Sequence, residues 1–342
     1  MKTRAFAFLL ALAAGCAPRF DPRLVDAPIA GRTWVSTEQR GHPLVGKIWQ
    51  PASGRFVDEA TLVAAVTASD FVALGEVHDN PDHHLLQARL LRALIAAGRR
   101  PALAFEMLTT DQQPAVDAAL SGAPRDPDAL GKAVNWSQSR WPDFKYYRPL
   151  FAAGLDAGLP IVAANLPRKQ MSEIVSKGRE GLDEGLRISL AREEPLSDAT
   201  VSSLRDEMKE SHCGALPDGM VDPMVLGQRA RDARMAERMV SVGAERGAVL
   251  ITGSGHARTD RAVPALVAKD APGRKVVSVA FLEAQSGEDD PATYRDEGEK
   301  GPAPYDFLVF TPGITRRDPC EGLREHIEKK GLKKATPPAA TP

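Results

Sequence analysis

The 342-residue chain has few cysteines and few aromatic side chains, and it has almost no net charge. Three cysteines are too few for a disulfide-rich scaffold, and none of them form a Cys-x-x-Cys pair. The 44 basic and 45 acidic side chains nearly cancel, so no basic field is available for non-specific binding to nucleic acid. Aromatic residues make up only 6% of the chain, which argues against a base-stacking platform. We therefore expect no nucleic-acid partner.

The sequence also lacks several motifs that define known chemistries. There is no His-Glu-x-x-His zinc motif, no Cys-x-x-Cys-His haem attachment site, no Gly-x-Gly-x-x-Gly fingerprint and no Gly-x-Ser-x-Gly elbow. A zincin, a thioredoxin and a c-type cytochrome are therefore excluded. Beyond an N-terminal apolar run, no hydrophobic stretch is long enough to span a membrane as a helix.

The N-terminal segment is typical of an export signal. Lys2 and Arg4 precede a short apolar run over residues 6–14, and small residues then lead to Cys16. This pattern is typical of a bacterial lipoprotein signal that is cut before Cys16, which then carries acyl chains such as palmitate. Cleavage by an ordinary signal peptidase is the alternative. Ala17, in place of an aspartate, favours the outer membrane of the cell envelope as the site of the anchor.

The rest of the chain is predicted to form one α/β domain. Short apolar runs alternate with helical segments, which is typical of a mostly parallel sheet flanked by helices. After a signal peptide (1–15) and a lipid-anchored tether (16–32), we expect a single domain over residues 33–330 and a disordered tail over 331–342. A helical insertion of about residues 168–246 lies between the third and fourth strands. The strands are predicted at 71–74, 102–105, 160–164, 248–252, 276–282 and 307–310.

Local signals place the main helices. Asn80 followed by a proline predicts the start of a helix that continues to Ala97. An amphipathic pattern predicts one long helix from Met220 to Glu245. Shorter helices are expected over residues 147–157 and 259–268, and glycines within residues 34–56 indicate a hairpin. The chain therefore alternates strands and helices up to its last predicted strand.

Polar side chains gather at the ends of three predicted strands. Residues 75–78 (Gly-Glu-Val-His) end the first strand, Glu106 ends the second, and residues 253–256 (Gly-Ser-Gly-His) end the fourth. Two of the seven histidines thus stand three residues after a glycine at a strand end. Ligands of an open parallel sheet bind beyond the carboxyl ends of its strands. We expect one functional site formed by Glu76, His78, Glu106 and His256.

This set of two histidines and two glutamates fits more than one chemistry. The four side chains can bind a divalent metal, or they can form an acid–base set for hydrolysis. They can instead contact the carboxylates or the iron of a large ligand in an apolar pocket. A hydrogen-bonded loop histidine is the structural alternative for either histidine alone, but the pair with two glutamates favours function.

Other polar residues have more ordinary interpretations. Arg168 follows the third strand and can either clamp a carboxylate or remain solvated. His83 and His84 lie in the first turns of a helix, where the helix dipole disfavours a charged imidazole, so we interpret them as neutral or solvent-facing structural residues. We interpret Arg229 and Asp232 of the long helix as surface ion partners.

Two cysteines remain beyond the N-terminal segment. Cys213 and Cys320 would lie in an oxidising compartment if the export signal is used. They can then form one disulfide, and two independent buried thiols are the alternative.

The strand-end residues carry a resemblance to a known family. Residues 71–80 and 105–107 resemble the ChaN-type haem-binding lipoproteins. The superfamily also contains the erythromycin esterases, the Tiki proteases and TraB-like proteins, which share paired Gly-x-x-His motifs with a glutamate. The resemblance extends from about Gly46 to Pro312. Further matching segments are 161–168, 212–217, 228–236, 253–256 and 307–312.

The resemblance implies an α/β sheet core with a helical insertion and a pocket that accepts haem b. It also implies a homodimer in which two cofacial haems lie between two monomers. Iron ligation in such sites is by tyrosine, and the candidates here are Tyr147, Tyr146 and Tyr305. The family places Asp-Tyr before the last strand, whereas this chain has the reversed order Tyr305-Asp306. His78, His256 and Arg168 are the remaining candidate contacts to haem.

Three hypotheses follow from the sequence. The first is a lipid-anchored envelope protein that binds haem and assists iron uptake without turnover. The second is a hydrolase of esters or peptides, with Glu76 or Glu106 activating water and His78 and His256 orienting it or holding a divalent metal. The third is an anchored scaffold with a vestigial site.

Overall fold

The computed structural model describes residues 20–122, 125–192, 196–295, 301–316, 318 and 320–321. Its centre is one eight-stranded sheet in the order β2-β1-β8-β7-β3-β6-β4-β5. All pairs from β8 to β5 are parallel, and β1 pairs antiparallel with both β2 and β8. The predicted mostly parallel α/β fold is confirmed. The strands are β1 (Ile48–Gln50), β2 (Arg55–Val57), β3 (Phe71–Glu76), β4 (Ala102–Thr109), β5 (Ile161–Asn165), β6 (Ala248–Gly253), β7 (Val276–Glu283) and β8 (Phe307–Thr311).

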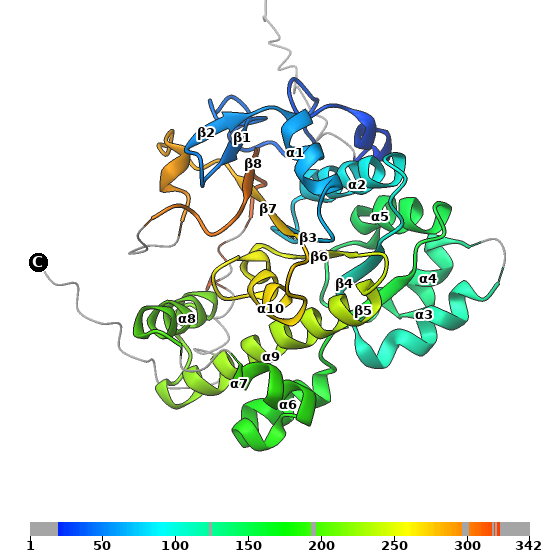
Figure 1. The fold of residues 1–342 in the computed structure, drawn as a ribbon. Coiled ribbons are helices and arrows are strands. Elements are labelled where there is room, and N and C mark those ends of the chain that lie inside the picture. Colours follow the sequence, from blue (N-terminus) through cyan, green and yellow to red (C-terminus); the bar gives the residue numbers. More distant parts are fainter. Residues whose placement is uncertain are drawn as a thin grey trace, which may run out of the picture.

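The α-helices lie on both faces of the sheet (Figure 1). Those of the described residues are α1 (Glu59–Thr67), α2 (Pro81–Ala96), α3 (Gln113–Leu120), α4 (Pro127–Ala133), α5 (Phe144–Asp156), α6 (Arg168–Lys177), α7 (Glu184–Ala191), α8 (Asp198–Ser211), α9 (Asp218–Gly243) and α10 (Val263–Asp270). The Asn80 side chain accepts a hydrogen bond from the Asp82 amide and caps α2, as its position before Pro81 predicts. The helix expected from residue 259 begins only at Val263, because residues 254–257 form a 3₁₀ turn and Pro264 favours the first turn of a helix.

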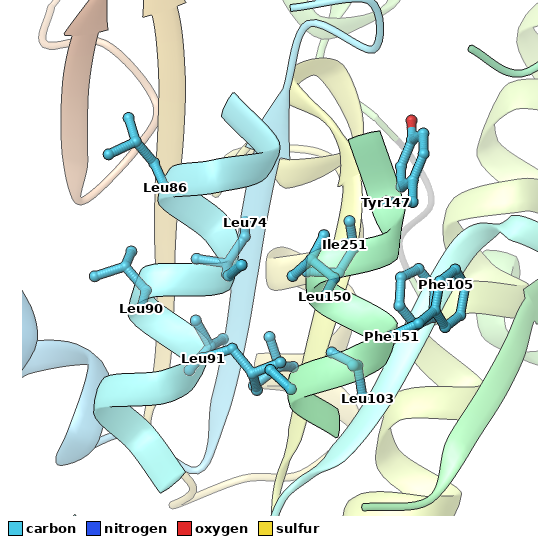
Figure 2. Packing of buried hydrophobic residues seen from close by; sticks show 14 of the residues in the cluster. Leu74, Leu86, Leu90, Leu91, Leu103, Phe105, Tyr147, Leu150, Phe151 and Ile251 are labelled. Carbon is cyan, nitrogen blue, oxygen red and sulfur yellow. The ribbon is translucent and has the colours of Figure 1, made fainter. Parts of the chain in front are cut away.

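Each face of the sheet buries alternate residues of the same strands. Leu74 and Phe105 point to the face covered by α2 and α5, where Figure 2 shows Leu86, Leu90, Leu150 and Phe151 packed around them. Their neighbours on β3 and β4 pack with α6, α7, α9 and α10 on the other face. Every residue of β3 is buried, because helices cover both faces of this central strand.

The predicted insertion between the third and fourth parallel segments is present. It comprises α6 to α9, which gather in the lower part of the view in Figure 1. The 26-residue α9 contacts β4, β5 and β6, and α8 packs on α9. The insertion therefore carries α9 across the carboxyl ends of the strands that hold the site.

The tether prediction for residues 16–32 is wrong for its second half. Residues 22–26 form a 3₁₀ helix, and Val25 and Ile29 are fully buried in the main core. The Ile29 amide also donates to Glu59 of α1 over 2.9 Å. The error arose because this short segment has no periodic pattern, so only the tertiary contacts show that it packs. Residues 1–19, with Cys16, and the predicted tail over 331–342 lie outside the described residues.

The C-terminal part is joined to the helical insertion by a covalent bond. Cys213 follows α8 and forms a disulfide with Cys320, which is 107 residues away in sequence. Of the two alternatives for these cysteines, the structure has the disulfide. Among the residues described, no helix is long and apolar enough to cross a membrane.

Candidate functional site

The two Gly-x-x-His segments lie side by side because β3 and β6 are parallel neighbours. Glu76 pairs with Gly253 in register, so both segments leave the sheet at the same edge. A Cβ at Gly75 would lie 2.8 Å from Ala257 Cβ and 2.9 Å from Ser254 Cα. A side chain at Gly75 would therefore push the second segment off the sheet, which explains the glycine at the end of β3.

His78 is held by the carboxylate of Glu76. Its Nδ1 donates to Glu76 Oε1 over 2.9 Å, and the Tyr147 hydroxyl donates to the same oxygen over 2.6 Å. The His84 ring lies beside the other oxygen, with its Nδ1 3.1 Å from Glu76 Oε2, while its Nε2 donates to the His78 carbonyl over 2.8 Å. Glu76 is thus held through Oε1 by His78 and Tyr147, and its Oε2 accepts no hydrogen bond from the residues described.

The charge states of this group follow from its neighbours. Burial alone raises the pKa of Glu76, but His84 and His78 outweigh it and the pKa falls to about 2. Burial lowers the pKa of His78, but the bond to Glu76 and the nearby Glu106 raise it to about 9. Burial, followed by the charge of Glu76, raises the pKa of Tyr147 well above its usual value. At neutral pH, His78 is thus a cation, Glu76 an anion and Tyr147 a neutral phenol.

Glu106 forms the second acidic group of the site. Its Oε2 accepts hydrogen bonds from Thr252 Oγ1 and from the Gly253 amide, both over 2.7 Å. Its Oε1 accepts from Arg231 Nη2. Burial raises the pKa of Glu106, but His256, Arg231 and His78 together hold it well below its usual range. Glu106 is therefore a fixed anion in which both oxygens are engaged.

His256 is held by a second carboxylate, on α9. Its Nδ1 donates to Asp232 Oδ1 over 2.6 Å, and its Nε2 lies 3.2 Å from Gln228 Nε2 and 3.5 Å from Glu106 Oε1. Arg231 Nη1 donates to Gln228 Oε1, so the Gln228 amide nitrogen faces His256 Nε2. Gln228 thus donates to His256 Nε2. Burial is the main cause of the raised pKa of Asp232.

The interpretation of Asp232 and Arg229 as surface ion partners is wrong. Asp232 is 4% exposed and Arg229 is 8% exposed. On a 26-residue helix rich in charged residues, the sequence does not show which charges face the sheet. Asp232 is four residues after Gln228, and this helical spacing places both side chains on the face that meets His256. That spacing is the signal by which Asp232 could have been found.

Two cavities meet at this edge of the sheet. The first, which we call the polar cavity, has a volume of about 340 Å³ and is lined by Glu76, His78, Glu106, Glu207, Arg231 and His256, among others. The second, which we call the methionine cleft, has a volume of about 910 Å³. Glu106 and Arg231 line both cavities and therefore form their common wall. All four side chains predicted to converge do so in the polar cavity.

The methionine cleft is apolar with cationic groups on its walls. Its apolar lining comes from Leu166, Met171, Val175, Met220, Pro223 and Met224. Arg140 and Arg168 line it too, and neither guanidinium forms a hydrogen bond or ion pair with the residues that the structure describes. Trp141 also lines the cleft and packs edge-on against His78, with ring centroids 4.9 Å apart.

The tyrosine candidates lie elsewhere. Tyr147 is fully buried on α5 (Figure 2). Its hydroxyl is committed to Glu76 and it lines neither cavity, so it is not placed to reach iron in either of them. Tyr146 stacks on His84, and Tyr305 donates to the Ser254 carbonyl on the far side of the second segment. No tyrosine of the described residues lines the polar cavity or the methionine cleft. The expectation of Tyr147 as ligand rested on sequence proximity, which does not show the direction of a buried side chain.

His83 and His84 are buried rather than solvent-facing. His83 Nδ1 accepts from the Val77 amide and its Nε2 donates to Thr311 Oγ1, so it is a neutral structural residue as predicted. Burial lowers the pKa of His83 well below its usual value. His84 is buried too, with its Nδ1 3.1 Å from Glu76 Oε2.

The charged side chains of the site are paired with one another. Arg231 pairs with Glu106, His78 with Glu76 and His256 with Asp232. Among the described residues, no group of three or more histidine, cysteine, aspartate and glutamate side chains is arranged to hold a metal ion. The geometry favours proton transfer and anion binding.

The fold and the paired Gly-x-x-His segments define an α/β protein with its site at the carboxyl edge of a mostly parallel sheet, and comparison with known families gives the narrower assignment. A family described as haem-binding uptake, Tiki superfamily, ChaN matches residues 62–267, which is well over half of the chain. The chain belongs to this family. A comparison with curated proteins found no match.

Solved structures agree with the fold. ChaN of Campylobacter jejuni, described with cofacial haem, superposes with a TM-score of 0.60 at 21% identity over 77% of this chain and 95% of that one. The type III effector HopBA1 matches at 14% identity and a TM-score of 0.38, covering 74% of this chain and 92% of that one. A mutant of erythromycin esterase EreC matches at 14% identity and a TM-score of 0.38, covering 80% and 84%. The last two likenesses are too weak to carry an argument.

The residues of the methionine cleft fit haem in part. A haem pocket needs an apolar slot, an axial ligand and cationic partners for two carboxylates. The cleft supplies the slot, methionine sulfurs and three arginines. It does not supply the expected tyrosine from the residues described.

Proposed function

We propose that this protein binds haem b in the methionine cleft. The observation that carries the proposal is the pairing of an apolar wall from α6 and α9 with Arg140 and Arg168, which have no partner among the residues described. A porphyrin presents an apolar face and two carboxylates, and bidentate bonds from arginine suit a carboxylate. Membership of the haem-binding family supports the same ligand. The sequence has no Cys-x-x-Cys-His, so the haem would be held without a covalent link.

We further propose that the protein acts in the bacterial cell envelope. The N-terminal pattern that ends at Cys16 supports a lipid anchor, and Ala17 supports the outer membrane. The Cys213–Cys320 disulfide agrees with an oxidising compartment. In this location the protein would take up haem and assist iron acquisition. A homodimer around two haems is the proposed assembly, which the resemblance to the family implies, and the Campylobacter jejuni relative is described with cofacial haem.

Titration of the purified full chain with ferric haem tests the haem proposal. Saturable binding should be visible in the Soret band. Arg140→Gln and Arg168→Gln should each weaken it several-fold, because each removes one carboxylate partner. Arg55→Gln is the matched control, since Arg55 lies on β2 outside the cleft. Sedimentation in the same titration reports dimers. A linear, non-saturable Soret change would refute the proposal.

One further observation favours hydrolysis as a second function. The His256–Asp232 pair has the arrangement of a general base and its orienting carboxylate, and His256 Nε2 lines the polar cavity. His78, across the cavity, has a pKa raised to about 9 and can act as the acid. The two imidazoles thus line the same cavity, one held by Asp232 and the other by Glu76.

The proposed hydrolytic step uses only residues of this chain. His256 Nε2 would take a proton from a water molecule, whose oxygen attacks the carbonyl carbon of an ester or amide. Asp232 would stabilise the resulting imidazolium through Nδ1, and Gln228 must first leave Nε2. His78 Nε2 would donate to the oxygen or nitrogen that leaves when its bond to carbon breaks. Glu106 is not the base, because both of its oxygens accept hydrogen bonds, and Glu76 holds His78 and Tyr147 through Oε1.

Hydrolysis of chromogenic esters and peptides tests this second function. His256→Gln and His78→Gln should each lower turnover at least a hundredfold. Asp232→Asn should lower it less and leave haem binding unchanged, since Asp232 does not line the methionine cleft. If all three variants keep the wild-type rate of hydrolysis, the activity comes from a contaminant.

A further inference from the structure

The methionine cleft offers iron an unusual choice of ligands. Haem iron in proteins is held by histidine, cysteine, methionine or tyrosine. Among the described residues that line the cleft there is no histidine, cysteine or tyrosine, whereas three methionines line it: Met171, Met220 and Met224. Glu106 also lines the cleft, but both of its oxygens already accept hydrogen bonds. The ligand donors of this cleft are therefore thioether sulfurs.

The three methionines are not equivalent. Met171 of α6 packs against the α9 backbone at Gly227, where the absence of a side chain leaves room for its thioether. Met220 stands in the first turn of α9 and is 37% exposed. Met224, one turn further along the same face, is half-buried in the cleft wall. Unlike Met171, Met224 is therefore not packed against the α9 backbone, and unlike Met220 it is not exposed to solvent.

The spacing along α9 also selects Met224. Met224 and Arg231 are seven residues apart, so both project from one face of the helix, separated by roughly 10 Å along its axis. Haem carries its iron at the centre of the ring and its two carboxylates at one edge. A sulfur and a guanidinium two turns apart on one face match this layout. Met220 is eleven residues before Arg231, roughly 16 Å along the axis, which is too far for one porphyrin to reach both.

We propose that Met224 sulfur is the axial ligand of haem iron in this protein, in place of the tyrosinate of the family, with Arg231 near the carboxylate edge. The proposal rests on the haem function proposed above. Thioether ligation stabilises ferrous iron and raises the reduction potential relative to an anionic oxygen ligand. The protein would therefore hold haem most firmly after reduction.

Spectra of the full chain with haem, before and after reduction with dithionite, test the assignment. The wild-type complex should show the near-infrared charge-transfer band of a thioether bound to ferric iron. Met224→Leu should lose this band, lower the reduction potential, and bind ferrous haem at least tenfold more weakly. Met220→Leu and Met239→Leu are the controls, because Met220 lines the same cleft and Met239 is buried in the core beneath α9. Both should keep the band.

The outcomes separate this inference from the function on which it rests. A tyrosinate-type spectrum, or a thioether band that survives in Met224→Leu, would overturn the ligand assignment while haem binding stands. Absence of saturable binding in the wild type would overturn both. Thermal unfolding of Met224→Leu is compared with that of Met239→Leu to show whether a loss of binding comes from misfolding. If it does, Met224→Gln takes the place of the leucine variant in the same measurements.

Discussion

Gly253 lies against the imidazole of His78, so that a Cβ at position 253 would come 3.0 Å from His78 Nε2. The contact is reciprocal with the one at Gly75, where a Cβ would meet the backbone of Ser254. Each Gly-x-x-His segment therefore supplies the glycine that makes room for the other. The two motifs work as one interlocked unit, which accounts for their occurrence as a pair on neighbouring strands.

Alanine at either glycine should destabilise the protein. Gly75→Ala places a methyl group 2.8–2.9 Å from two fixed atoms, which costs about 1–3 kcal/mol of overpacking. Gly253→Ala meets a side chain that can move, so we expect a smaller loss of stability and a displaced His78. Urea unfolding measures both free energies. Gly41→Ala is the matched control, because nothing lies within 4 Å of a Cβ there, and an equal loss in all three variants would contradict the steric explanation.

Tyr147→Phe separates a structural role from iron ligation. The change removes the hydroxyl that donates to buried Glu76, and loss of a hydrogen bond to a charged group costs about 1.5–3 kcal/mol. Since Tyr147 lines neither cavity, the Soret and charge-transfer bands of bound haem should not change. Thermal unfolding and haem spectra of the same sample check both parts. Altered ferric bands at unchanged stability would restore Tyr147 as the ligand.

Much of the fold follows from local signals, whereas part of the site does not. The apolar runs at residues 71–74 and 248–252 predict buried strands, and their terminal glycines and histidines predict the shared edge. Nothing near Glu76 in sequence indicates Tyr147, which is 71 residues away. Asp232 was missed for the same reason, since its contact with His256 depends on how α9 crosses the sheet.

The sequence also predicts only part of the methionine cleft. Arg168 was predicted from its place after the third strand, and it does line the methionine cleft. The methionines were not predicted, because in sequence they look like ordinary apolar positions of amphipathic helices. Only the packing of α6 beside α9 places them opposite Arg140 and Trp141.

Stability should fall at both ends of the pH range, because a different group loses its stabilising contribution at each end. The pKa of Glu76 is lowered to about 2, so its stabilising contribution is complete above the unfolded value near 4.5 and is lost as pH falls towards 2. The pKa of His78 is raised to about 9, so its contribution is complete below the unfolded value near 6.5 and is lost as pH rises through 9. His78→Gln should remove the alkaline limb of the stability profile and also weaken the acid limb, because His78 helps to lower the pKa of Glu76. An alkaline limb that persists in this variant would contradict the assignment.

The Cys213–Cys320 disulfide should stabilise the whole chain. It joins two points 107 residues apart and so removes much conformational freedom from the unfolded state. Cys320→Ser should lower the free energy of unfolding by about 2–4 kcal/mol. Urea unfolding of the variant and of the reduced wild type should agree. If reduction also lowers the stability of Cys320→Ser, the reductant destabilises the protein by some route other than breaking this disulfide.

Arg231 is the residue on which both cavities depend. It donates to Glu106, to Asn165 Oδ1 over 3.1 Å and to Gln228 Oε1 over 3.3 Å. Arg231→Gln leaves the Glu106 carboxylate buried without its cation, so we expect a loss of about 3–5 kcal/mol in the free energy of unfolding. Glu106→Gln with Arg231→Gln should recover most of that loss, because the uncompensated charge is then gone.

The double variant also distinguishes stability from ligand binding. Haem affinity should stay low in Arg231→Gln with Glu106→Gln, since the cationic partner of the carboxylate edge is still missing. A double-mutant cycle on unfolding free energies and on haem affinities measures the two effects separately. If stability is not recovered, Arg231 acts through Asn165 and Gln228 rather than by neutralising Glu106. If haem affinity returns with stability, Arg231 shapes the cleft and does not contact the ligand.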